Sequence, residues 1–570
     1  MTPATASAPP RPSVLARFGP LAAVLVAIAL VAVLASTGRN DTSTTASGAS
    51  QAGGGSRADT RNPDLPITWA EADKAGTTGR YDWGDDCDPE TGRVKIPSKY
   101  APPCVVARPG VKGGATSQGV TDNEIKVVYY EFADDDIAAS LQSKLDPVAV
   151  RQEAGEKLTR MLEARFELWG RKIKIVRLKG SGSDETSARA DAVKVASEIG
   201  AFASLGGPAQ EGAYADELSS RGVICIGCGL AVPDSTFQRN APYMWGNSMT
   251  AEQFLPILGD YTIKRLFKRK ASFAGDPAMR TRTRVFGAVH FEQDPPVFEA
   301  TEKAVAAEGA KVGYKSAVTL TYQLVIPELA QKARTLIARL KEAKVTTVIF
   351  LGDPLMPIYL TKAATDQDYF PEWVITGTVL TDTTVLGRLY DPKQWAHAFG
   401  VSPLPAAQPR EDRDAWALYQ WFYGKAPAAV KTVGVVYPPI QLLMIGVHLA
   451  GPNLTPETFR DGLFGYPPSG GTPTSPQYSF GEHGFFDAPD FNSVDDMTEI
   501  WWDAKAHGLD EQGVEGDGMV RYADGGKRFK AGEQPAGPPR AFRKKGSVLI
   551  YDEVPAADVA PEYPSPAKGN

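Results

Sequence analysis

Acidic side chains crowd one short segment of the chain. Asp134, Asp135 and Asp136 follow the apolar run IKVVYY, which ends at Tyr130, and Glu131 comes directly after that run. Carboxylates gathered at the mouth of a site accept hydrogen bonds from an ammonium or a polyol, or coordinate a cation. The three aspartates would equally form a solvated charge run that caps the next helix, so both interpretations stand.

Glycine-rich turns form a second group of candidates. They comprise Gly206, Gly207, Pro208, Ala209 and Gln210, and then Gly229, Leu230 and Ala231 within GCGLA. Glycine lets backbone N–H groups approach a ligand, and a helix that begins near Ala209 would add the positive end of its dipole. The alternative is that these glycines only make tight turns between a strand and a helix.

Polar residues also follow apolar runs in the middle of the chain. They are Glu292, Gln293 and Asp294 after FGAVHF, Asp353 after VIFLG, and Thr376, Thr378 and Asp382 after WVITG. Each is a candidate ligand contact, because ligands of open α/β sheets bind outside the carboxyl ends of the strands.

The elements that must position these residues alternate along the chain. Strand-like runs at 125–130, 173–178, 202–205 and 223–226 are separated by amphipathic helical patterns, and the rhythm restarts after a break near residue 247. Repeated βα units predict parallel sheets. We therefore expect a two-lobed α/β domain over 118–505, with lobe I at about 118–247 and 405–455 and lobe II at about 248–404. Trp245 lies at the first connection, where core packing is favoured over stacking on a ligand.

Length and charge exclude several classes of protein. A chain of 570 residues is too long for one core, and 61 Lys and Arg against 67 Asp and Glu give a net charge of −6, which argues against nucleic acid as the main partner. No phosphate-binding loop, G-x-S-x-G or H-E-x-x-H motif is present, and the five histidines show no ligand pairing. We therefore expect that the protein is not an enzyme and that it has no cofactor and no metal site.

The N-terminal region sets the expected compartment. After a short segment, 1–17, residues 18–35 (FGPLAAVLVAIALVAVLA) carry no charge and are flanked by Arg17 and Arg39. Such a run is a signal peptide or a signal anchor that contacts the membrane. Residues 36–58, rich in Gly, Ser and Thr, predict a flexible stalk, so the rest of the chain is expected outside the cytoplasm.

Cysteines can then form disulfides. Cys87 and Cys104 lie in an irregular extension, 59–117, and are predicted to pair. Cys225 and Cys228 end a strand-like run, where a disulfide requires a turn at Gly227, so a turn disulfide, buried thiols and a metal or redox role remain open.

The C-terminal region differs in composition from the rest. Residues 506–570 are rich in Gly and Pro, and 527–545 carry seven Lys or Arg against the single acid Glu533. Such a segment docks on anionic lipid, cell-wall polymer or a partner, or is simply a solvated extension, which is favoured. Residues 553–570 are expected to be disordered.

Three segments carry a family resemblance. GVTDNEIKVVYY, LGGPAQEGAYADELSSRGVICIGCG and AKVTTVIFLGDPLMPIYLTKAATDQDYFPEWVITG, in this order, resemble the type I periplasmic binding proteins of the branched-chain amino-acid class, which are solute-binding subunits of ABC transporters. The resemblance implies two Rossmann-like lobes joined by hinge strands, with the ligand held in the cleft between them. Members that bind amino acids use Ser or Thr where this chain has Gly206 to Ala209 and Gly229 to Ala231, which argues against an ordinary amino-acid ligand.

The function that the resemblance implies is capture of a small solute of unknown identity outside the cytoplasm. An ABC transporter permease would then be the partner. The alternative is a membrane-tethered ligand-sensing or cell-surface interaction protein with the same fold.

Overall fold

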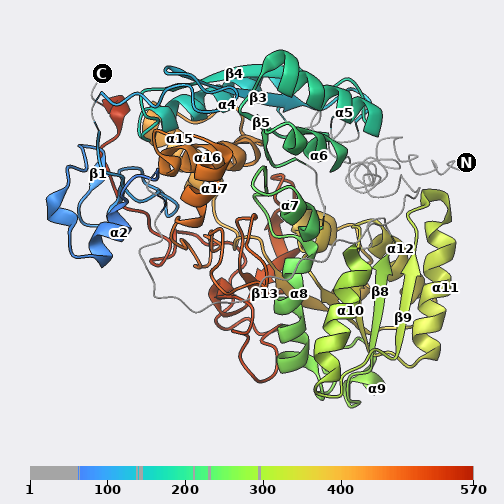
Figure 1. Ribbon diagram of the computed structural model, residues 1–570. Helices are drawn as coiled ribbons and strands as arrows, with labels where there is room; N and C mark the ends of the chain where they lie inside the picture. The colour runs from blue at the N-terminus through green and yellow to red at the C-terminus, as the bar shows by residue number, and fades with distance from the viewer. Residues whose placement is uncertain are drawn as a thin grey trace, which may run out of the picture.

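The apolar side chains gather into two separate cores, one in each of the two groups of helices and strands that Figure 1 shows. The computed structural model describes residues 62, 64–108, 110–136, 139, 146–208, 212–228, 233–292 and 297–568. The first core takes residues between 94 and 245 and between 415 and 491, and the second takes residues between 249 and 406 and between 497 and 541. The predicted arrangement of two α/β lobes is therefore confirmed. The apolar run 18–35 lies outside the described residues.

The first lobe is built on a parallel sheet of five strands in the order β4-β3-β5-β6-β7. β3 lies between β4 and β5, and this interior position buries its Ile125, Val127 and Val128 completely. The strands are β3 (Glu124–Glu131), β4 (Lys172–Lys179), β5 (Ala203–Leu205), β6 (Ile224–Ile226) and β7 (Met244–Trp245).

Helices from two stretches of the chain pack on this sheet. They are α4 (Val148–Glu163), α5 (Glu185–Val193) with η3 (Lys194–Ile199), α6 (Gly212–Ser220), α7 (Asp234–Arg239), α15 (Asp414–Tyr423), α16 (Val433–Ala450) and α17 (Pro456–Phe464). In the described part of the chain, only α16 is long and apolar enough to cross a membrane, and 72% of that window is buried. Such burial is typical of a core helix in a globular lobe.

The second lobe is built on an eight-stranded sheet with the path β14-β13-β12-β11-β10-β8-β9, in which β15 pairs with β13. The strands are β8 (Phe286–Phe291), β9 (Val318–Tyr322), β10 (Thr347–Leu351), β11 (Glu372–Ile375), β12 (Ala398–Ser402), β13 (Met497–Leu509), β14 (Glu515–Tyr522) and β15 (Arg528–Phe529). Strands β8 to β12 run parallel, whereas β13 to β15 are antiparallel. The late part of the chain thus extends the sheet of the second lobe.

The helices of this lobe follow from their apolar spacing. In α11, Leu329, Ala333, Leu336 and Leu340 all point to the core, at helical intervals. The helical segments are α8 (Ala251–Tyr261), η4 (Thr262–Leu266), α9 (Pro277–Arg280), α10 (Val297–Ala310), η5 (Ile326–Glu328), α11 (Leu329–Glu342), α12 (Met356–Asp366), η6 (Thr378–Leu380), α13 (Thr384–Gly387) and α14 (Pro392–Trp395).

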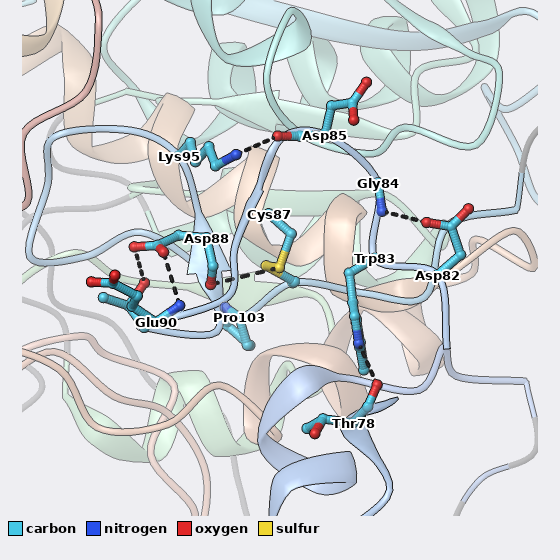
Figure 2. Close-up of a disulfide and its surroundings, with 12 residues drawn as sticks. Thr78, Asp82, Trp83, Gly84, Asp85, Cys87, Asp88, Glu90, Lys95 and Pro103 are labelled. Carbon is cyan, nitrogen blue, oxygen red and sulfur yellow. Dashed lines mark hydrogen bonds between the residues drawn. A yellow bond between two sulfur atoms is a disulfide. The ribbon is translucent and has the colours of Figure 1, made fainter. Parts of the chain in front are cut away.

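A disulfide holds the segment before the first lobe. Cys87 of β1 (Cys87–Asp88) is bonded to Cys104, with the two Cα atoms 5.6 Å apart, and β1 pairs with β2 (Arg93–Val94). Figure 2 shows the surrounding hydrogen bonds, in which Lys95 donates to the Asp85 carbonyl at 2.8 Å and the Trp83 indole to the Thr78 carbonyl at 2.9 Å. Helix α2 (Trp69–Lys74) and η2 (Thr78–Arg80) complete the segment.

We expect reduction of this disulfide to destabilise the protein. A bond between cysteines 17 residues apart restricts the unfolded chain, which corresponds to about 3 kcal/mol in the free energy of unfolding. The Cys87→Ser, Cys104→Ser double variant, compared with the native protein in urea, measures that loss. An unchanged unfolding midpoint would show that the extension does not unfold with the first lobe.

Four segments of the described chain cross between the lobes. Three are 246–250 after β7, 403–413 after β12, which includes η7 (Arg410–Asp412), and 490–496 before β13. The first and third run side by side, since the Gly246 amide donates to the Phe491 carbonyl at 2.9 Å.

The fourth crossing is the C-terminal segment, drawn in red in Figure 1. It leaves the second lobe where Val548 pairs with Tyr522, and there it runs past η8 (Ala523–Gly526), which comes earlier in the sequence. It reaches the first lobe where the Tyr563 hydroxyl donates to Asp88 at 2.8 Å, and η9 (Pro566–Lys568) follows. The prediction of disorder after 553 is therefore wrong for 553–568, because the Trp421 indole donates to the Tyr563 carbonyl and the Thr472 hydroxyl donates to Asp558, which fixes this part of the chain.

The basic segment 527–545 is only partly a solvated extension. Arg528 is buried and forms an ion pair with Asp496 at 2.7 Å, and Phe542 packs on Phe273 with ring centroids 4.9 Å apart. The prediction of a solvated segment fails at these positions, because composition alone does not show which basic residues have buried partners.

Candidate functional site

The carboxyl ends of the parallel strands face the space between the lobes. The chain leaves the first sheet at the carboxyl end of β7 and leaves the parallel part of the second sheet at the carboxyl end of β12, and in each case it enters the other lobe. Loops at these ends are where open α/β sheets place ligands. The candidates within the described residues lie at these strand ends or in the loops that follow them.

Tyr130 stands at the end of β3 and is held by its own lobe. Its hydroxyl donates to Asp191 at 3.0 Å, and its ring packs on Tyr214 with centroids 5.1 Å apart. Burial, together with the Asp191 carboxylate, raises the pKa of Tyr130. The same carboxylate accepts from the Ser181 amide at 2.9 Å, so Asp191 joins the loops that follow β3 and β4.

The acidic segment divides into exposed and buried members. Asp134 is almost fully exposed and pairs with Lys179 at 2.8 Å, while Asp135 accepts from the Ser183 amide at 3.3 Å. Asp136 is buried, and Glu131 accepts a hydrogen bond from Gln152. Asp134 and Asp135 therefore present carboxylates to solvent, whereas Glu131 is half-buried.

The glycine turn after β5 is shaped by its neighbours. Gly206 has a φ of +79°, and its amide donates to the Ile226 carbonyl at 2.9 Å. A Cβ on Gly207 would lie 2.6 Å from the Tyr214 ring, so packing requires a glycine there. Pro208 is buried beside it.

Cys225 and Cys228 form a disulfide across the turn after β6, with the Cα atoms 5.8 Å apart. Gly227, between them, has a φ of +68°, the turn that the sequence required for this pairing. Seven candidates lie outside the described residues: Ala209, Gln210, Gly229, Leu230, Ala231, Gln293 and Asp294.

In the second lobe, the polar candidates bond mainly to their own lobe. Asp353 is fully buried, caps the start of α12 by accepting from the Leu355 and Met356 amides at 2.7 and 2.9 Å, and accepts from the Tyr322 hydroxyl. Thr376 and Thr378 are 3.0 Å apart and donate to the carbonyls of β10 and its following turn. Glu292, by contrast, is exposed and accepts from Thr321.

Asp382 is the most perturbed of these candidates. It is buried, accepts from the Ser402 hydroxyl, and has a second carboxylate oxygen without a protein partner. Burial raises the pKa of Asp382 to about 7.

Sequence reasoning missed the strained turn after β11. Gly377, Val379 and Leu380 all have left-handed φ values, of +78°, +45° and +63°, and Leu380 is 38% exposed. Left-handed conformations are costly for branched side chains and cluster at functional sites. No local sequence signal marks a left-handed Val-Leu pair.

A second missed feature is a pair of buried carboxyl groups within the third crossing. Asp490 accepts from Gln253 of the second lobe at 2.6 Å, and Asp495 accepts from Gln477 at 3.1 Å. Burial raises the pKa values of both carboxyl groups, and repulsion adds to the rise, from Asp495 at Asp490 and from Asp496 at Asp495. Neither aspartate stands in a pattern that sequence inspection singles out.

Other features of the described residues lie away from this region or offer no cluster for chemistry. A surface groove of about 670 Å³ lies over α4 and β4, where Glu124, Glu156, Arg160 and Lys174 line it and are taken up in ion pairs. Among the described residues, no three His, Cys, Asp or Glu side chains are grouped to hold a metal ion.

Comparison with known proteins gives structural matches only. No protein-family model and no curated protein matches the sequence. Solved structures similar to this chain include solute-binding proteins of ABC transporters. This is the class of protein that the sequence resemblance indicated.

Three of these structures illustrate the range of ligand classes among the similar proteins. A solute-binding protein from Rhodopseudomonas palustris HaA2, in complex with p-hydroxybenzoic acid, is 14% identical, with 74% of this chain and 100% of that chain covered at a TM-score of 0.47. A fatty acid transporter protein from Thermomonospora curvata is 16% identical (75% and 98% covered, TM-score 0.45). A branched-chain amino acid transporter protein from Streptococcus pneumoniae, in complex with isoleucine, is 13% identical (70% and 100% covered, TM-score 0.41).

Proposed function

We propose that this chain is an extracytoplasmic solute-binding protein, without enzymatic activity, that holds a small molecule between its two lobes and presents it to an ABC-type importer. The observation that carries the proposal is the orientation of the two parallel sheets, whose strand carboxyl ends face the same space between the lobes. A ligand there contacts both lobes and stabilises their closed arrangement.

The chemistry of the loops supports this function. The first lobe offers the exposed carboxylates of Asp134 and Asp135, and the second offers Glu292 together with the exposed, strained Leu380. The buried Asp353, Thr376 and Thr378 hold the turns of the second lobe in place. A ligand with a donor group and an apolar part would match both sides.

The first experiment is a thermal-shift screen of the full chain in detergent against amino acids, amides, polyols, aromatic acids and metal salts. A ligand at 100 times its dissociation constant adds about 2.7 kcal/mol to the free energy of unfolding, which we expect to see as a clear rise in melting temperature for one of these classes. A set without any shift would contradict a role in solute capture.

The site is then tested with matched variants. We expect Asp134→Asn with Asp135→Asn to weaken ligand binding about tenfold, or ~1.4 kcal/mol. Asp122→Asn, an exposed aspartate just before the amino end of β3, is the control and should bind normally. Calorimetry measures both, and equal affinities would remove the acidic segment from the site.

A further inference from the structure

The end of the second lobe farthest from the first lobe carries mostly basic side chains. This end is formed by the turns that precede β8, β9 and β10 and by α9, which Figure 1 shows at the bottom of the molecule. Its exposed side chains include Lys268, Lys270, Arg280, Arg282, Lys344 and Arg543. We refer to these six residues as the basic end.

The basic residues come from distant parts of the chain but lie together. The Ala271 amide donates to the Arg282 carbonyl at 2.9 Å, which joins the turns containing Lys268 and Arg282. The Arg282 guanidinium in turn donates to the Lys344 carbonyl at 3.2 Å. The segment containing Arg543 joins them through the stacking of Phe542 on Phe273.

Structural ion pairs do not account for these charges. Between 264 and 284, Arg265 and Arg284 are buried and pair with Glu499 and Glu372, each at 2.7 Å. Within the described part of the chain, Lys268, Lys270, Arg280, Arg282 and Arg543 form no ion pair, and the described acids nearby include the exposed Glu342, Asp366 and Asp368 and the half-buried Asp276, which caps α9. On the first lobe, exposed basic residues such as Lys174, Arg177 and Arg189 pair with acids.

Apolar groups project at the same end. Val312 is 44% exposed in the turn between α10 and β9, with Lys311 and Lys315 on either side, and Pro277 and Ala278 are exposed in α9. Basic side chains interspersed with small apolar ones are typical of surfaces that adsorb to anionic lipid headgroups. The whole chain has a net charge of −6, so this concentration of positive charge is confined to one end of the protein.

We propose that the basic end docks on the anionic phospholipid headgroups of the membrane from which the protein is exported. The chain is expected to be held near that membrane by residues 18–35, and the positive charge of the basic end is complementary to anionic headgroups. The proposal shares the extracytoplasmic location with the proposed function but needs no ligand.

The test uses energy transfer from the protein to labelled vesicles. The four native cysteines are in disulfides, so Ser272→Cys, exposed within the basic end, gives the full chain a single thiol for a fluorescent donor. We expect stronger transfer to vesicles of phosphatidylcholine with about one third phosphatidylglycerol than to phosphatidylcholine alone, and loss of the difference at ~0.5 M salt, where charges are screened within ~4 Å.

Charge reversal identifies the surface. K268E/K270E/R282E should lower the transfer to the phosphatidylcholine level, whereas K332E/R334E/K362E, three exposed residues on α11 and α12, should leave it unchanged. Equal transfer to both kinds of vesicle, or full transfer by the first triple variant, would overturn the proposal. Inorganic phosphate that abolishes transfer at constant ionic strength would show a free-anion site instead and equally overturn it. The thermal-shift screen is unaffected by any of these results, so the two proposals fail separately.

Discussion

Replacing Arg528 by methionine is expected to lower the free energy of unfolding by about 3 to 5 kcal/mol. Lys527→Met, at the exposed neighbouring residue, should change it by less than ~0.5 kcal/mol. Urea unfolding of the two variants and the native protein, at equal pH, measures the difference.

The reason is the position of Arg528 between two of the crossing segments. Its guanidinium donates to Asp496 at 2.7 Å, to the Pro403 carbonyl at 2.7 Å and to the Leu404 carbonyl at 2.8 Å, and its side chain is fully buried. Methionine fills most of the volume but donates no hydrogen bond. It therefore leaves a buried carboxylate and two carbonyls without these donors, which costs far more than the loss of an exposed charge.

The same residue should matter for ligand binding. Arg528 joins the second crossing to the third, so its loss should loosen the connection between the lobes and weaken the affinity for whichever ligand the screen finds. A variant that retains native stability would contradict the buried ion pair. A destabilised variant with native affinity would show that these crossings do not restrict lobe closure.

The arrangement of the two lobes could be predicted from the sequence because apolar periodicity reports which residues are buried. The run IKVVYY became β3, and the spacing of Leu329, Ala333, Leu336 and Leu340 became α11. The strands β13 and β14 were not predicted, because Gly- and Pro-rich composition around them hides the alternation. Their placement depends on β12, a partner about 100 residues earlier in the chain, and a single sequence does not show such pairing.

The candidate site was predictable only as a set of loops. Position after a strand selected Asp134 and Asp353 equally, but the structure exposes the first and buries the second as a helix cap. Composition likewise grouped Arg528 with Arg543, although one is a buried hydrogen-bond donor and the other is exposed. Tertiary packing decides which side of a loop faces solvent, and the local sequence at these positions has no pattern that shows it.

The second prediction concerns pH. The quantity compared is the free energy of unfolding of Asp495→Asn minus that of the native protein. We expect this difference to be roughly 3 kcal/mol larger at pH 8 than at pH 5, in favour of the variant. Asp487→Asn, at an exposed aspartate three residues before Asp490, should follow the native protein at both pH values. Comparing variant with native protein cancels opposing groups such as His448, whose pKa burial lowers to about 4.

The geometry of the carboxyl pair determines whether stability rises or falls with pH. One oxygen of Asp490 accepts from Gln253 at 2.6 Å and from the Asn492 amide at 2.8 Å, and one oxygen of Asp495 accepts from Gln477 at 3.1 Å and from Ser479. The other two oxygens have no further protein donor, and a proton shared between them satisfies both.

Both carboxyl groups have pKa values raised above the ordinary value near 4, so the folded protein binds a proton that the unfolded chain releases. Their contribution to stability is therefore full below about pH 4 and is lost as the pH rises through the folded pKa values. An asparagine amide at 495 donates to Asp490 at every pH and removes the repulsion between two carboxylates.

Because Asp490 bonds to Gln253 of the second lobe, loss of the shared proton should also loosen the third crossing. Unfolding curves of variant and native protein that stay parallel from pH 5 to pH 8 would show that the two carboxyl groups do not share a proton.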